Sequence, residues 1–152
     1  MALPTISEED VREFIPSATE VAPSGRGGQK VVFRVWRDDQ CFALKFALLP
    51  DNFQPEIADI DETILRARRE TRIMEECKSP HIIKPGPIVL GTAVINGQNV
   101  LYFSEEFIDG QSLGEFLRQH GTLTVESLVR LGLQMCSAID ELWSLGKIPP
   151  AG

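Results

Sequence analysis

The sequence is poor in metal-binding and redox side chains, since its 152 residues include two histidines and three cysteines. Cys41, Cys77 and Cys136 lie far apart and form no C-x-x-C pair, so we expect neither a metal site nor a disulfide framework. No apolar run approaches the roughly 18 residues that indicate a membrane-spanning helix, and the N-terminus lacks a signal-peptide pattern. These absences predict a cytoplasmic protein.

Basic charge is also scarce. Lys and Arg total 15 against 22 Asp and Glu, which gives a net charge of −7. A negative surface disfavours nucleic acid and anionic membranes as partners. Hydrophobic residues make up 43% of the chain, which is enough for one ordinary core. We therefore expect one domain, or one part of a larger domain.

Local patterns predict an α+β chain with an antiparallel sheet, because strands come first, then a helix, then strands, then helices. Ser7 and Asp10 mark the start of a short helix. The segment 19–48 is rich in β-branched and aromatic residues and is expected to form strands, with a turn at Asp38-Asp39.

The middle of the chain carries one helix and one hairpin signal. Residues 59–78 have apolar side chains three or four positions apart, and Ser79-Pro80 is expected to stop this helix. Asn96-Gly97 lies between two apolar runs and predicts a hairpin, because both turn positions need positive φ.

The remaining residues predict helices. The longest, at about 124–145, is followed by Gly146 at the position of a C-terminal cap. The expected organisation is an N-terminal helical extension, a region built on the sheet, a pair of helices and a short tail, at residues 1–18, 19–108, 109–148 and 149–152.

The stretch 24–35, SGRGGQKVVFRV, places three glycines before a lysine and a strand. A dinucleotide fold and a Walker A loop both need their glycines to open a helix, so neither fits. Two interpretations remain. The segment is either a plain β-turn or a hairpin whose exposed backbone N–H groups approach a phosphate.

Lys45 interrupts the apolar run CFALKFALL and shares one face of its strand with Ala43. It is either an edge lysine that reaches solvent or an ammonium paired with a carboxylate beside a ligand anion. Glu70 borders the apolar stripe of the helix at 59–78 and is the expected partner. The alternative for Glu70 is a surface pair with Arg66, one turn earlier.

A glycine hairpin, an A-x-K strand, a helix with a glutamate and the motif SPHIIKP follow one another in this order. Together they resemble the N-terminal lobe of a protein kinase, most closely the eukaryotic-like bacterial serine/threonine kinases. LYFSEEFIDGQSLGEFL resembles the fifth strand, the hinge and the next helix, and LQMCSAIDELWSLGKI resembles the helix before the catalytic loop. The resemblance runs from about Val21 to Ile148 and implies a kinase-like N-lobe at 19–108, followed by two helices that begin a C-lobe.

The resemblance also implies ATP as ligand, with ATP-dependent phosphorylation of serine or threonine as the activity of the family. Lys45 matches the strand lysine that holds the α- and β-phosphates, and Glu70 matches the helix-C glutamate that pairs with it. Further contacts to the nucleotide are implied for glycines over the phosphates, side chains above the adenine and hinge backbone along its edge: Gly25, Gly27, Gly28, Val32, Ala43, Glu106 and Ile108.

Two residues depart from the family pattern. Lys30 stands at the third glycine of G-x-G-x-x-G, where its side chain adds positive charge near the phosphates. Glu105 stands at the gatekeeper position, and the sequence supplies no physical reason for a glutamate there.

No residue matches the catalytic aspartate of H-R-D or the asparagine and aspartate that hold Mg²⁺ in the family. We therefore expect Mg²⁺ to accompany the nucleotide without a ligand from this chain. We also expect weak ATP binding and no phosphoryl transfer by the chain alone.

The helix at 124–145 lies inside the C-terminal lobe in the family. Its apolar stripe is therefore expected to need another cover, which is the N-terminal lobe, a second copy or a partner chain. The stripe contains Leu128, Met135, Ile139 and Leu142. This leaves a non-catalytic interaction or scaffold module as the alternative function, and an unrelated α+β domain as a third possibility.

Overall fold

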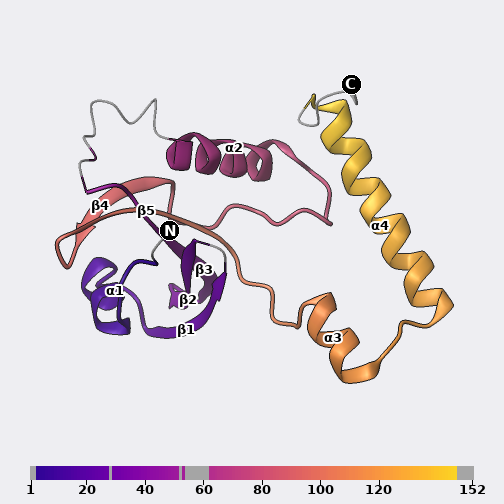
Figure 1. Cartoon of the computed structure of the whole chain (residues 1–152), viewed down its shortest axis with the longest axis horizontal. Helices are drawn as coiled ribbons and strands as arrows, with labels where there is room; N and C mark the ends of the chain where they lie inside the picture. Colours follow the sequence, from indigo (N-terminus) through magenta and orange to yellow (C-terminus); the bar gives the residue numbers. More distant parts are fainter. Residues whose placement is uncertain (1–2, 28, 52, 54–61, 147–152) are drawn as a thin grey trace. The chain divides into compact units, whose positions relative to one another are not determined.

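The computed structural model describes residues 3–27, 29–51, 53 and 62–146 (Figure 1). Within them the chain forms an α+β fold, as the sequence predicts. In chain order the elements are α1 (Glu8–Phe14), β1 (Glu20–Gly27), β2 (Lys30–Arg37), β3 (Gln40–Leu48), α2 (Glu62–Glu76), β4 (Gly91–Ile95), β5 (Gln98–Glu106), α3 (Leu113–His120) and α4 (Val125–Ser144).

The chain divides into two compact units. The first contains residues 1–72 and 84–107 and holds α1 and the sheet. The second contains residues 73–83 and 108–152 and holds α3 and α4. The boundary between the two units falls within α2.

The five strands form one antiparallel sheet in the order β1-β2-β3-β5-β4. The expected turns are confirmed. Asp38 and Asp39 both have positive φ, at 50° and 61°, and join β2 to β3. Asn96 and Gly97, with φ of 51° and 71°, join β4 to β5. The β4–β5 hairpin therefore returns β5 to the side of β3, after α2 has intervened in the chain.

One face of the sheet is apolar and packs against α1. Strand partners directly opposite each other share a face, so Val31 and Phe46 lie on the same side as Phe33 and Leu44. Val11 of α1 is completely buried among them. The buried members of this core are Val11, Ile15, Val21, Val31, Phe33, Val35, Phe42, Leu44, Phe46, Ile95 and Val100.

The stripe predicted for α2 is buried at its described apolar members, whereas its polar member Thr71 is half-buried. Ile64, Ala67, Met74 and Cys77 are each at most 4% exposed, whereas Ile60 lies outside the described residues. The helix ends at Glu76, before the predicted stop at Ser79-Pro80.

The C-terminal helices begin and end at the residues that the sequence indicates. Thr124 caps α4 by accepting a hydrogen bond from the backbone N–H of Ser127 at 3.2 Å, and Gly146 has the positive φ of a C-terminal cap. Neither α3 nor α4 contains a buried residue. No helix in the described ranges combines the length and hydrophobicity needed to cross a bilayer.

Helix α1 starts with a reciprocal capping box. Asp10 donates its backbone N–H to Ser7 Oγ at 3.2 Å, and its Oδ2 accepts the Ser7 N–H at 2.7 Å. The backbone hydrogen bond from Ser7, followed by the Ser7 hydroxyl, lowers the pKa of the Asp10 carboxyl. The charged carboxylate is therefore favoured in the folded state.

We expect Asp10 to titrate below its ordinary pKa of 3.8 in a carboxyl NMR titration. Its contribution to stability is present above that pH and is lost as the pH falls through the lowered folded value. The variant Ser7→Ala removes the hydroxyl partner and should move the pKa of Asp10 upward. Ser112→Ala, which disrupts the equivalent box of α3, serves as the control and should leave Asp10 unchanged. An Asp10 that titrates at or above 3.8 would contradict this assignment.

Candidate functional site

The face of the sheet opposite α1 carries charged residues, and we refer to it as the Lys45 face. Antiparallel register places its side chains in three rows that cross β2, β3 and β5. The first row, nearest the glycine turn, contains Lys30, Ala47 and Leu101. The second contains Val32, Lys45 and Phe103, and the third contains Arg34, Ala43 and Glu105. The predicted shared face of Ala43 and Lys45 is therefore confirmed, and Val32 belongs to it.

Lys45 is paired across the sheet with Glu105. Its Nζ lies 2.6 Å from Glu105 Oε1, and the two side chains are 19% and 8% exposed. Glu105 stands directly opposite Ala43, two residues from Lys45, so the pair is diagonal between β3 and β5. The ion pair supplies the reason for a glutamate at this position, because a nearly buried ammonium is costly without a counter-charge.

Glu70 of α2 pairs with Lys30 instead. Lys30 Nζ lies 2.6 Å from Glu70 Oε2, with side chains 25% and 35% exposed. Among the described residues, neither the expected pair of Glu70 with Lys45 nor the alternative pair with Arg66 is formed. The physical reason is that Glu105 already neutralises Lys45, while Lys30, in the first row, reaches the helix.

One aromatic ring lies beneath both ammonium groups. Lys30 Nζ is 4.6 Å from the centre of the Phe103 ring, and Lys45 Nζ is 5.8 Å from it. Both distances are within the range of a cation–π attraction. Phe103 is 1% exposed, so the two ion pairs share one buried aromatic ring.

The described glycines of the glycine stretch, Gly25 and Gly27, lie in the last part of β1, just before β2 begins at Lys30. Gly25 lies at a bulge in β1 with φ of 159°, and a Cβ added there would meet nothing within 4 Å. Gly27 pairs with Lys30 and closes the turn, whereas Gly28 lies outside the described residues. Strands β1 and β2 thus pair as a hairpin around the glycine segment, which both interpretations of that segment allow, and Lys30 is the first residue of β2.

The two residues that the resemblance places in a hinge, Glu106 and Ile108, fall in different units. Glu106 ends β5 and pairs twice with Lys84, donating its N–H to the Lys84 carbonyl at 2.9 Å and accepting the Lys84 N–H on Oε1 at 2.8 Å. Its backbone N–H is therefore already satisfied within the first unit. Ile108 is 60% exposed and belongs to the second unit.

Within the second unit, Glu141 of α4 holds the segment that follows α2. Its two carboxylate oxygens accept the backbone N–H groups of Lys78 and Ser79 at 2.5 and 2.6 Å. Hydrogen bonds to a charged acceptor are stronger than neutral ones. The sequence analysis did not single out Glu141, and a contact between groups 62 residues apart has no local signal.

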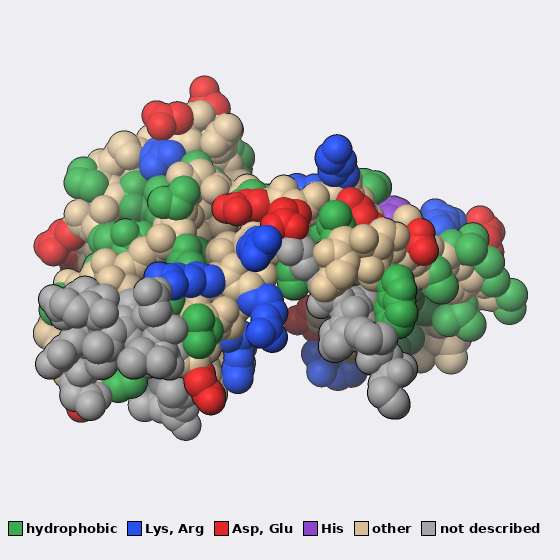
Figure 2. Space-filling model, turned by 90° about the horizontal axis from the view of Figure 1, so that it is seen from above, with side chains coloured by type: hydrophobic (Ala, Val, Ile, Leu, Met, Phe, Trp, Pro, Cys, Tyr) green, Lys and Arg blue, Asp and Glu red, His purple; other side chains and the backbone are tan. Residues whose placement is uncertain are grey.

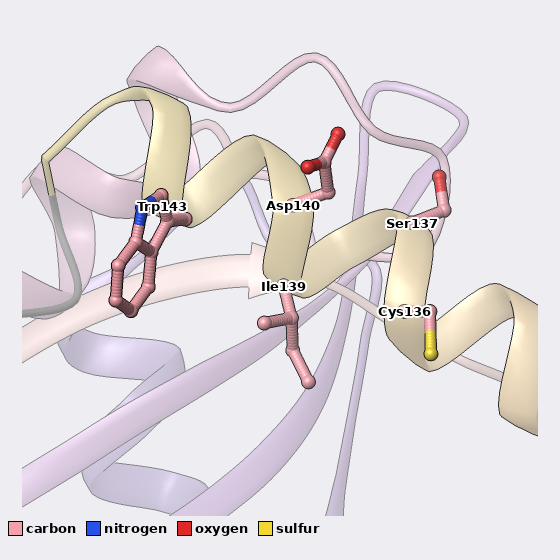
Figure 3. A pocket seen from close by; sticks show the side chains of 5 residues that line it. All are labelled: Cys136, Ser137, Ile139, Asp140 and Trp143. Atoms are coloured by element: carbon pink, nitrogen blue, oxygen red, sulfur yellow. The ribbon is translucent and has the colours of Figure 1, made fainter. Parts of the chain in front are cut away.

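Two hollows border α4. One of about 430 Å³ lies between His81 and the helix residues Leu131, Gln134, Met135, Ala138 and Ile139. The other, of about 550 Å³, is lined by Cys136, Ser137, Ile139, Asp140 and Trp143. Figure 3 shows Cys136, Ile139 and Trp143 projecting from one side of the helix, with Ser137 and Asp140 on the other.

Large apolar side chains of α4 face solvent. Leu128, Met135, Ile139 and Trp143 are 58%, 55%, 49% and 52% exposed. Hydrophobic side chains are visible along the surface formed by the C-terminal helices (Figure 2). Where exposed apolar side chains form a large patch, the patch marks an interaction site.

Comparison with known proteins adds no assignment: no protein-family model matches the chain, and no curated protein matches it. The kinase resemblance therefore rests on the sequence motifs alone. Within the described residues, no group of three or more His, Cys, Asp and Glu side chains could hold a metal ion.

Breaking the Lys45–Glu105 pair should destabilise the fold strongly. Lys45→Met leaves the 8%-exposed carboxylate of Glu105 without its cation and is expected to cost about 3 kcal/mol in the free energy of unfolding. The double variant Lys45→Met/Glu105→Leu replaces the pair by apolar side chains and should recover most of that loss. Denaturant unfolding measures both.

The exposed pair between Arg34 and Glu20, whose side chains are 39% and 54% exposed, provides the control. Glu20→Gln should change stability by less than about 1 kcal/mol. Equal losses from Lys45→Met and Glu20→Gln would show that the Lys45–Glu105 pair is not a buried interaction.

Proposed function

We propose that this chain is the ATP-binding portion of a serine/threonine protein kinase, and that its 152 residues do not transfer the phosphoryl group by themselves. The observation that carries the proposal is the Lys45 face. A glycine hairpin lies at one end of it, and two lysines lie in the two rows nearest the hairpin. Val32 shares the second row with Lys45, and Ala43 lies in the third row, towards the end of β5.

This arrangement suits a nucleotide chemically. Backbone N–H groups of a glycine turn and lysine ammonium groups are the donors that phosphate oxygens accept. The half-buried Val32 provides apolar surface for a planar base, whereas Ala43 is 6% exposed and adds little to it. The five-stranded antiparallel sheet, with a helix inserted between its third and fourth strands, is compatible with a kinase N-lobe.

Phosphoryl transfer needs more than these groups. It depends on metal ions that neutralise the developing charge and on a residue that orients the attacking hydroxyl. Since no residue here matches those parts of the family pattern, we propose weak nucleotide binding for the isolated chain, with Mg²⁺ entering as the counter-ion of ATP.

One observation favours a second candidate function, a non-catalytic interaction module. Helix α4 exposes apolar side chains along its length, and Glu141 fixes the helix to the preceding segment of its own unit. The surface of residues 124–145 would then bind a second copy of the chain or a partner helix.

ATP binding is tested by titrating the chain with ATP in calorimetry, with and without Mg²⁺. The wild type should bind saturably, and Lys30→Met/Lys45→Met should raise the dissociation constant at least about tenfold, or about 1.4 kcal/mol, because both ammonium groups are lost. Lys78→Met makes the same side-chain change at an exposed residue outside the Lys45 face and should leave the affinity unaltered. Absence of saturation at millimolar ATP would argue for the interaction module.

Self-association is tested by sedimentation over a dilution series. Met135→Glu places a charge on the apolar side of α4 and should weaken association at least about tenfold. Ser137→Glu, two residues along and on the other side of the helix, is the matched control and should not change it. A wild-type chain that stays monomeric at every concentration would contradict self-association through α4.

A further inference from the structure

The two lysines of the Lys45 face are not equivalent, and their positions along the sheet separate them. Lys30 lies in the first row, directly across the turn from Gly27. Lys45 lies in the second row, opposite Val32. Two residues along a strand span about 7 Å, so Lys30 starts closer to the glycine turn by that distance.

The two lysines also have different partners. Glu105 is in the third row, so the ion pair directs the Lys45 ammonium away from the glycine turn and towards the row that holds Ala43. Glu70 comes from α2 and holds the Lys30 ammonium over the Phe103 ring at 4.6 Å. Both ammonium groups therefore lie over the same ring, and the two lysines differ in the row from which each starts and in the carboxylate that each contacts.

The cost of desolvation also favours Lys30 over Lys45 as the lysine that contacts a phosphate. A phosphate that drew Lys45 away would leave Glu105, 8% exposed, as an uncompensated buried carboxylate, which is costly. Glu70 is 35% exposed and remains hydrated when it shares Lys30 with a ligand. An ammonium has three N–H donors, so Lys30 keeps one bond to Glu70 and presents the others.

We infer that Lys30 is the phosphate-contacting lysine of this chain, that Glu70 is its positioning residue, and that Lys45 forms a structural pair with Glu105. This inference rests on the proposed ATP binding. It reverses the roles that the kinase resemblance implies for the two lysines. In this assignment, the ion pair with Glu105 keeps Lys45 from contacting the phosphates. Lys30, at the third glycine position, thereby makes the phosphate contact that the strand lysine makes in the kinase family.

The experiment compares the binding of ATP and adenosine, because adenosine lacks the phosphates. Lys30→Met should raise the dissociation constant for ATP about tenfold or more and that for adenosine less than about threefold. Lys30→Arg keeps the charge and should restore most of the ATP affinity. Glu70→Gln should weaken ATP binding without changing adenosine binding.

Lys45 is tested in the pair-replaced variant Lys45→Met/Glu105→Leu, which avoids an unpaired buried carboxylate. Its affinity for ATP should stay within about threefold of wild type. A loss of ATP affinity in this variant that equals or exceeds the loss in Lys30→Met would overturn the inference. So would an equal loss of ATP and adenosine binding in Lys30→Met.

A pairing test that needs no ligand separates this inference from the proposed function. Shifts in melting temperature should be non-additive for Lys30→Met with Glu70→Gln and additive for Lys45→Met with Glu70→Gln. The opposite pattern would overturn the assigned pairs even if ATP binds. A wild-type chain with the expected pairs that binds no ATP would instead overturn the proposed function, and the phosphate contact with it.

Discussion

Two ammonium groups lie over one buried phenylalanine ring, and each is held by a carboxylate on the same side of the sheet. Lys30 pairs with Glu70 and Lys45 pairs with Glu105, with Phe103 between them. An ammonium at this depth is costly without a counter-charge, so the carboxylates decide where the lysines point. The sheet carries these two ammonium groups because a carboxylate of β5 and a carboxylate of α2 neutralise them.

The opposite, apolar face of the sheet depends on the alternation of side chains along each strand. Successive side chains of a strand point to opposite sides, so the residues between the charged ones form the aromatic and aliphatic core under α1. A slip of one residue between β2 and β3 would send Lys45 into that core. The tight turn at Asp38 and Asp39, both with positive φ, fixes the register that keeps Lys45 opposite Val32.

Local structure could be predicted from the sequence because its signals are local. The Ser7 cap, the Asn96-Gly97 turn and the stripe of α2 all depend on residues a few positions apart, and the structure contains each of them. The charge pairs could not be predicted in this way. Lys45 meets Glu105 only because β5 docks against β3, and this neighbourhood is set by the strand order of the whole sheet. Likewise, Glu141 meets a segment 62 residues away.

The pairing also accounts for the weak affinity proposed for ATP. Three cations lie on the Lys45 face, and each has a carboxylate within hydrogen-bonding distance: Lys30 with Glu70, Lys45 with Glu105 and Arg34 with Glu20. A face whose positive charges are neutralised in this way offers a polyphosphate little net attraction. Binding must then come from directional hydrogen bonds and from apolar contact with the base. Lys30 contributes such bonds at a lower desolvation cost than Lys45. The partner of Lys30, Glu70, stays hydrated, whereas Lys45 would leave the buried Glu105 without a counter-charge.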